Sequence, residues 1–138
     1  MHPCAPPLFK KKIEEIYLNF LRIFLGMIEH YSFGEFIVDG KRFESNIVLL
    51  GKTVKPARYL PGHDLTLEDI KPLVDFEPEV IIIGTGAYGV MKVKDEIKRY
   101  VEERGIKLII AETKKACDKY NELLRKGVKV AAFLHNTC

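Results

Sequence analysis

The sequence predicts a single α/β domain of three layers, with a central mixed and largely parallel β-sheet, flanking helices and an N-terminal antiparallel meander. Three observations support this prediction. Apolar runs typical of buried strands alternate with helical patterns over residues 80–134, as in parallel strands joined by crossover helices. A short apolar run at residues 36–38 leads into the dipeptide Asp39-Gly40, and residues 41–44 return, as in a tight antiparallel hairpin. The length of 138 residues suits one ordinary domain.

The antiparallel part begins after Ile28. Residues 36–38 are apolar and lead into Asp39-Gly40, which favours the positive φ angles of a type I′ turn, and residues 41–44 run back. A second apolar run follows at residues 47–50. These segments together predict a meander with short loops.

A loop and a helix follow the meander. Residues 56–64 contain two prolines and one glycine and predict a loop. Thr66 has the character of a helix N-cap, with two acidic residues in the first turn. Pro72 is expected to limit this helix or split it.

The second half of the chain predicts three parallel strands and two helices. Residues 80–83 form a continuous β-branched run, which is typical of a strand covered on both faces. In the last helix we expect Tyr120 in the core and Asn121 on the surface. The other elements are a helix with its apolar stripe at residues 97–101, a strand at 106–110, a helix from Thr113 to Gly127, and a strand at 128–134.

A glycine-rich segment, GTGAYG at residues 84–89, directly follows the first buried strand. Glycines with this spacing let backbone N–H groups approach a pyrophosphate, and Glu112 lies near the position of a ribose-binding acid. A dinucleotide site nevertheless fits poorly, because the next helical stripe begins only at Ile97 and the chain ends after three such strands. The segment therefore predicts either a tight turn packed closely on the sheet or a cleft for an anion or small molecule.

The loop arginine Arg58 is the other candidate for anion binding. A loop arginine is either a solvated surface group or an anion clamp. The candidate ligand-binding residues are Arg58, Gly84, Thr85, Gly86 and Gly89.

The C-terminal segment contains two residues with reactive side chains, His135 and Cys138. Their arrangement does not indicate an active site. They stand three apart without a second ligand pair, so no metal site is predicted. Alternation along a strand would place them on opposite faces, so for His135 we expect packing or capping. No catalytic residue and no cofactor is predicted.

Charge and cysteine content exclude several classes of protein. The 22 basic and 19 acidic residues are spread along the chain, and the one basic run is at residues 10–12, which argues against nucleic-acid binding. Three cysteines without a CxxC motif favour a reducing cytoplasm. The chain contains no tryptophan and is rich in lysine and glutamate, a composition typical of thermophile proteins.

Residues 1–26 are expected to form an N-terminal amphipathic extension to a domain at residues 27–138. Apolar residues recur there on a helical period, but charged residues interrupt them, so neither a membrane span nor a signal peptide is predicted. Three interpretations stay open. The extension docks on its own domain or on a partner, it anchors the chain to a membrane surface, or it lies upstream of a working start at Met27.

Several separated motifs, in this order, resemble those of the Mth-type domain family, which includes the adipogenesis-associated Mth-domain protein and a mitochondrial complex I assembly factor. The motifs are YSFG at residues 31–34, IVDG at 37–40, IIGTGA at 82–87, KYN at 119–121 and AAFLHNTC at 131–138.

This resemblance implies a single three-layer domain whose biochemical activity is largely unassigned, with roles in assembly or regulation through protein partners. It also implies that residues 84–89 and Arg58 border a pocket. The chain departs from many relatives in having Ala57, rather than tryptophan, just before that arginine.

We therefore expect a soluble, non-enzymatic interaction or assembly module with a protein partner, a homo-oligomer among its candidate states, and an anion or small-molecule cleft at the glycine loop. The alternative is a small-molecule-binding enzyme or sensor that uses residues 84–89 and Arg58. The sequence names no reaction.

Overall fold

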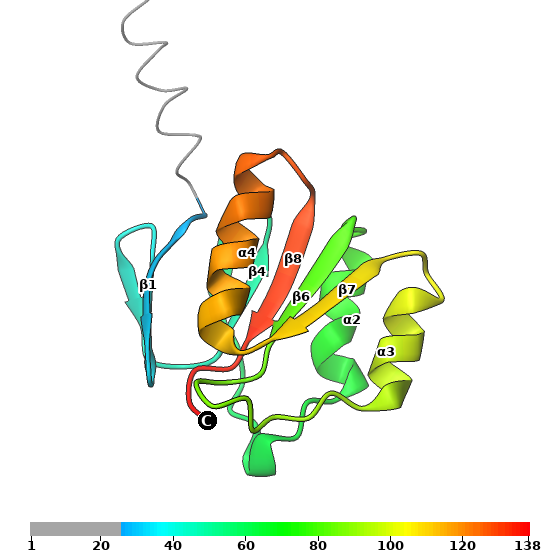
Figure 1. Ribbon diagram of the computed structural model, residues 1–138, viewed down its shortest axis with the longest axis horizontal. Helices are drawn as coiled ribbons and strands as arrows, with labels where there is room; N and C mark the ends of the chain where they lie inside the picture. The colour runs from blue at the N-terminus through cyan, green and yellow to red at the C-terminus, as the bar shows by residue number, and fades with distance from the viewer. Residues whose placement is uncertain (1–25) are drawn as a thin grey trace, which may run out of the picture.

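The computed structural model describes residues 26–138, which form three layers around a central β-sheet (Figure 1). The predicted amphipathic extension lies outside the described residues except for Gly26. The three-layer α/β fold expected from the sequence is confirmed.

The central sheet is mixed. Its strand order is β5-β4-β8-β6-β7. Strand β6 pairs in parallel with β7 and β8, while β4 pairs antiparallel with β8 and β5. The strands are β4 (Ile47–Leu50), β5 (Thr53–Pro56), β6 (Val80–Gly84), β7 (Lys107–Ala111) and β8 (Val130–Leu134).

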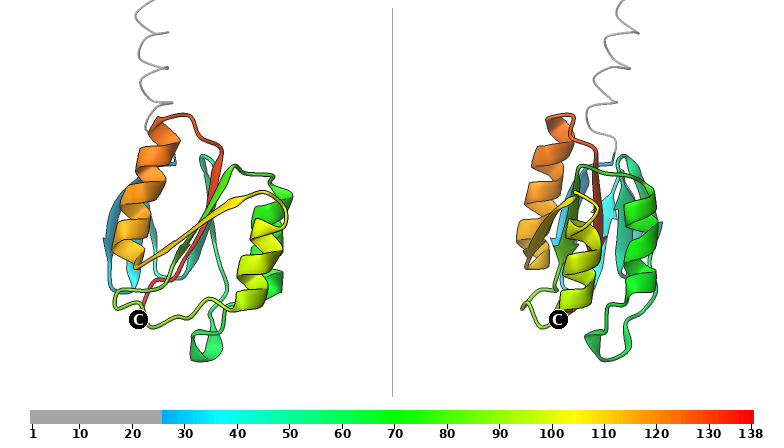
Figure 2. Two further views of the ribbon diagram at one scale, coloured as in Figure 1. Left: turned by 45° about the vertical axis from the view of Figure 1, so that its right-hand side comes forward. Right: turned by 90° about the vertical axis from the view of Figure 1, so that its right-hand side faces the viewer.

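Helices cover both faces of this sheet (Figure 2). Helices α2 (Leu67–Asp75) and α3 (Asp95–Glu102) lie on one face. Helix α4 (Thr113–Arg125) lies on the other, together with a three-stranded sheet of β1 (Ile28–Ser32), β2 (Glu35–Val38) and β3 (Lys41–Phe43).

The continuous apolar strands explain why both faces are covered. Every residue of β6 is buried, with Ile81 and Ile83 facing α2 and α3 while Ile82 faces α4. Tyr120, fully buried in α4, packs in the same cluster as Ile82 and confirms its expected place in the core. Burial of this kind contributes about 25 cal/mol per Å² of apolar surface.

Three local expectations need correction. The antiparallel half is not one meander, because β3 and β4 belong to different sheets. Helix α2 runs through Pro72 and ends at Asp75, beginning with the capping box of Thr66 and Asp69. Asn121 is not a plain surface residue, since its side-chain amide bonds to both the N–H and the C=O of Ile28, at 2.8 and 2.9 Å, and so ties α4 to β1.

Candidate functional site

The carboxyl ends of the parallel strands β6, β7 and β8 meet at one edge of the central sheet, where α/β folds most often bind ligands. The glycine loop at residues 84–89 follows β6 at this edge, and the C-terminus of the chain ends beside it (Figure 1). The next helix, α3, begins only at Asp95. The glycine loop therefore does not open the helix that follows it in the chain.

The last residues of the chain fill the hollow of the glycine loop. The N–H of Ala87 donates to the carbonyl of Thr137 at 2.7 Å, and the N–H of Val90 donates to the carbonyl of Cys138 at 3.0 Å. Gly86 has a φ of 101°, and a Cβ built on it would lie 2.1 Å from the carbonyl carbon of Cys138. Only glycine allows the C-terminal backbone to approach this closely.

Thr113, the first residue of α4, fastens the same loop from the other side. Its hydroxyl oxygen accepts the N–H of Gly86 at 2.8 Å, and its hydroxyl donates to the carbonyl of His135 at 2.8 Å. The N–H of His135 in turn donates to the carbonyl of Gly84 at 3.0 Å. Thr113 is fully buried, so these bonds form in the absence of competing water.

The remaining predicted loop residues are also bonded within the chain. The N–H and hydroxyl of Thr85 both donate to the carbonyl of Ala111, at 2.9 and 3.2 Å, and the N–H of Gly89 donates to the carbonyl of Gly86 at 3.3 Å. The backbone N–H groups of Thr85, Gly86, Ala87 and Gly89 are therefore already in use. Anion binding by this loop stays a prediction, and it requires the C-terminal residues to move away.

Arg58 is about half-exposed, and its guanidinium is paired within the chain. Its Nε and Nη2 donate to the two carboxylate oxygens of Asp69 at 2.6 and 2.8 Å. Burial alone would raise the pKa of Asp69, but the bonds from Arg58 and Thr66 outweigh it and lower that pKa. Arg58 thus ties the loop before α2 to the capping box of that helix.

A buried polar network that sequence reasoning missed lies at the same edge. The Oδ1 of Asn46 lies 2.9 Å from the Nδ1 of His135, and the Nε2 of His135 lies 3.0 Å from the Nδ1 of His63. The side chain of His135 is buried, as expected for packing. The pairing of Ile47 with Leu134 explains the first contact, because it makes Asn46 and His135 neighbours, but no local sequence pattern signals this long-range pairing.

This network connects Arg58 to the glycine loop through main-chain groups. The side chains of the predicted site residues do not line a common cleft. The Nδ2 of Asn46 donates to the main-chain carbonyl of Arg58 at 2.9 Å. His135 then connects to Gly84 and Thr113, as described above. The guanidinium of Arg58 itself donates to Asp69 and, among the described residues, makes no hydrogen bond to the glycine loop.

Two exposed aromatic side chains project beside the glycine loop. Phe33, in the turn between β1 and β2, is 56% exposed, and Tyr88 of the glycine loop is 73% exposed. Their ring centroids lie 6.3 Å apart. The N–H of Gly34 donates to the carbonyl of Asn136 at 2.7 Å, so the C-terminal residues hold both turns at this edge.

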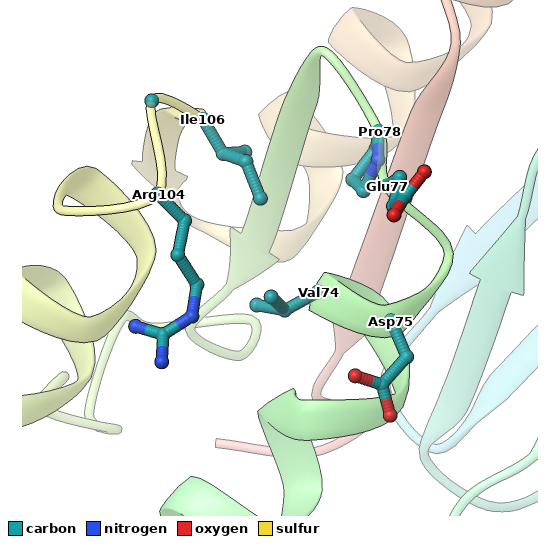
Figure 3. A pocket seen from close by; sticks show the side chains of 7 residues that line it. Val74, Asp75, Glu77, Pro78, Arg104 and Ile106 are labelled. Atoms are coloured by element: carbon teal, nitrogen blue, oxygen red, sulfur yellow. The ribbon is translucent and has the colours of Figure 1, made fainter.

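A cavity of about 530 Å³ lies at the opposite end of the strands, between the carboxyl ends of α2 and α3 (Figure 3). Its wall includes Val74, Asp75 and Arg104. The guanidinium of Arg104 stacks on the ring of Tyr100, 3.6 Å from its centroid, and donates to that residue's carbonyl at 2.8 Å. None of the predicted site residues lines this cavity.

The described residues 26–138 contain no group of three histidine, cysteine or acidic side chains placed to hold a metal ion. Among the same residues, no helix has the length and apolar character needed to cross a membrane.

Comparison of the sequence with models of known protein families identifies one family for this chain. The family described as "Protein of unknown function (DUF498/DUF598)" matches residues 28–135. The chain belongs to this family. The predicted resemblance to the Mth-type domain is thereby confirmed, and a solved structure called MT938 agrees with it, at 28% identity and a TM-score of 0.66 over 81% of this chain and 98% of that one.

Curated relatives of this DUF498 chain carry the name NADH dehydrogenase [ubiquinone] 1 alpha subcomplex assembly factor 3. The proteins from Bos taurus and Mus musculus are each 28% identical to it over 109 residues, which is 78% of this chain. The match covers 59% and 58% of those proteins, so the chain spans less than two thirds of their length.

Solved structures share the fold. An outer membrane protein from Bartonella henselae has a TM-score of 0.72 at 25% identity, over 83% of this chain and 99% of that one. A conserved hypothetical protein from Pyrococcus horikoshii has a TM-score of 0.70 at 29% identity, over 80% and 98%. A Bordetella pertussis protein described as a Mth938-like domain, 20% identical over 81% and 86%, has a TM-score of 0.64 and supports the fold alone.

Proposed function

We propose that this domain is a protein-interaction module that helps to assemble larger complexes, and that its partner binds the edge of the sheet around Phe33 and Tyr88. The exposed, mutually packed pair of aromatic rings carries this proposal. Large aromatic side chains are the residues that most often dominate protein interfaces.

The aromatic pair is held in place before any partner binds. The turn that carries Phe33 bonds through Gly34 to Asn136, and the loop that carries Tyr88 bonds through Ala87 to Thr137. A surface that is already ordered loses less conformational entropy on binding. The use of the C-terminal residues as packing for the glycine loop therefore supports a role in binding a protein surface.

The names of the curated relatives agree with this proposal. They are called assembly factors, and the match to them covers 78% of this chain. Assembly factors act by contact with other proteins, and an exposed aromatic pair supplies such a contact without any catalytic group.

The test compares three forms of the full chain as bait in quantitative affinity purification from the native organism. These are the wild type, the double variant Phe33→Ala with Tyr88→Ala, and the control Tyr59→Ala. Tyr59 is 80% exposed but has no aromatic partner among the described residues. We expect a defined protein to be enriched by the wild type and by Tyr59→Ala, and to be lost with the double variant.

Binding of the identified protein to the purified wild type should then be measured directly. Loss of an interface hot spot typically weakens binding by about 2 kcal/mol or more, which is roughly thirtyfold. Equal binding by the wild type and the double variant, both folded, would contradict the proposed surface.

A further inference from the structure

A short loop places His63 against the buried network in a conformation that non-glycine residues rarely adopt. His63 has a φ of 58° and follows Gly62, whose φ is 61°, in the single 3-10 turn Pro61–His63. Strained backbone conformations of this kind cluster at functional sites. In this conformation the Nδ1 of His63 lies 3.0 Å from the Nε2 of His135.

The hydrogen bonds of Asn46 determine where the protons of this network lie. Its Nδ2 faces the carbonyl of Arg58 and must be the donor there, so its Oδ1 is an acceptor. The same Oδ1 accepts the N–H of Asn136 at 2.9 Å and lies 2.9 Å from the Nδ1 of His135. The Nδ1 of His135 must therefore carry a hydrogen.

The protonation of His135 also determines which ring nitrogen of His63 donates a hydrogen bond. Burial, with the nearby charge of His63, lowers the pKa of His135 and favours its neutral form. Because Nδ1 of His135 is protonated, its Nε2 is a lone-pair acceptor, and the Nδ1 of His63 at 3.0 Å is the donor. The Nε2 of His63 is then the one ring nitrogen of the pair without a partner among residues 26–138.

His63 also lines a cavity of about 270 Å³ whose rim carries excess positive charge. The cavity is lined by Gly62, His63, Asp64, Val90, Lys92 and Lys94. The Nζ of Lys94 lies 2.6 Å from the Oδ1 of Asp64, so these two charges cancel. Lys92 has no acidic partner among the described residues, which leaves its ammonium group available to a ligand.

We propose that this cavity is a binding site for a small oxyanion, a phosphate or carboxylate group, held by the ammonium of Lys92 and by the Nε2–H of protonated His63. The Nδ1–H of His63 keeps its bond to His135 in both charge states, so a proton can be gained on the ligand side without breaking the network. Binding of the anion and uptake of a proton by His63 are therefore coupled. This site is distinct from the aromatic surface of the proposed function and does not depend on it.

The pH dependence follows from the groups that face His63. His135, Asp64, Lys92 and Lys94 surround it, from the end of β8, its own loop and the segment before α3. A bound oxyanion adds negative charge beside His63 and favours its protonated form, so affinity should be higher at acidic than at neutral pH.

The test is an NMR titration of the full chain with inorganic phosphate and, separately, with acetate, observing the imidazole nitrogens and carbons of all histidines. We expect saturable shifts of the His63 resonances with at least one anion, and tighter binding at acidic than at neutral pH. Shifts with phosphate alone identify a phosphoryl ligand, and shifts with acetate alone identify a carboxylate. No saturable shift of His63 with either anion overturns the proposal.

Variants locate the site. Lys92→Ala and His63→Asn should each weaken binding at least about tenfold, and asparagine is chosen because it tolerates left-handed φ angles. The control His30→Ala removes an exposed histidine of β1 and should leave binding unchanged. Equal affinity in the wild type and both pocket variants would place any binding elsewhere and refute the site.

A tautomer measurement on the unmutated chain tests the network itself. Long-range proton–nitrogen spectra should show Nδ1–H on both His63 and His135 at neutral pH. An Nε2–H tautomer on either histidine would contradict the proton arrangement on which the proposal depends.

Discussion

Replacing Thr113 by valine removes one hydroxyl and almost no volume, and it should destabilise the domain by about 2–4 kcal/mol. The hydroxyl of Thr113 serves two buried backbone groups, the N–H of Gly86 and the C=O of His135, each at 2.8 Å. The variant leaves both groups without this partner in a site that water does not reach.

The magnitude follows from the two bonds. A buried polar group that loses its partner costs about 1–3 kcal/mol, and valine introduces no void because it has the shape of threonine. The matched control is Thr113→Ser, which keeps the hydroxyl and loses one methyl group, at a cost of about 1 kcal/mol.

Urea denaturation of the three proteins, followed by circular dichroism, measures the difference. We expect Thr113→Val to be less stable than Thr113→Ser by about 1–3 kcal/mol, with a similar dependence on denaturant. A valine variant as stable as the serine variant would show that the hydroxyl does not fasten the glycine loop to the C-terminal residues.

Three further outcomes are expected. Gly86→Ala should be far less stable than Gly34→Ala, by about 2 kcal/mol or more in thermal unfolding, because its Cβ collides with Cys138 while that of Gly34 meets open space; equal losses would deny the close approach. Tyr120→Phe should lose about 1–2 kcal/mol in urea, since the buried hydroxyl donates to the carbonyl of Gly51; an unchanged midpoint would contradict that bond. The pKa of Asp69 is lowered below its ordinary 3.8, so its contribution is complete above that value and is lost as the pH falls through the lowered pKa. Asp69→Asn should therefore be less stable than the wild type at neutral pH but nearly equal in strong acid, and a constant difference across this range would refute the assignment.

Local sequence patterns predicted most of the helices and strands, because in those segments the local preference agrees with the tertiary structure. The β-branched run at residues 80–83 became β6 with every residue buried, and Thr66 is the N-cap of α2. The division of the antiparallel strands between two sheets was not predictable from these patterns. It depends on β4 pairing with β8, more than eighty residues away in the chain.

The candidate site was harder to predict for the same reason. The glycines at residues 84–89 suggested close approach of an anion to the backbone; in the structure the backbone of Thr137 and Cys138 lies against this loop, and anion binding there stays a prediction. Arg58 donates to the carboxylate of Asp69, which lies eleven residues further along the chain, beyond a loop. The contact of His63 with His135 spans 72 residues, and no local motif signals it.

Amide hydrogen exchange of Ala87 and Val90, followed by NMR, tests most directly whether the C-terminal residues occupy the glycine loop. Both N–H groups donate to carbonyls of the last two residues, so they should exchange slowly, with protection close to that of β6 and β8, whether or not inorganic phosphate is present. Fast exchange at both positions, or slow exchange only after phosphate is added, would show instead that the loop is open and receives an anion.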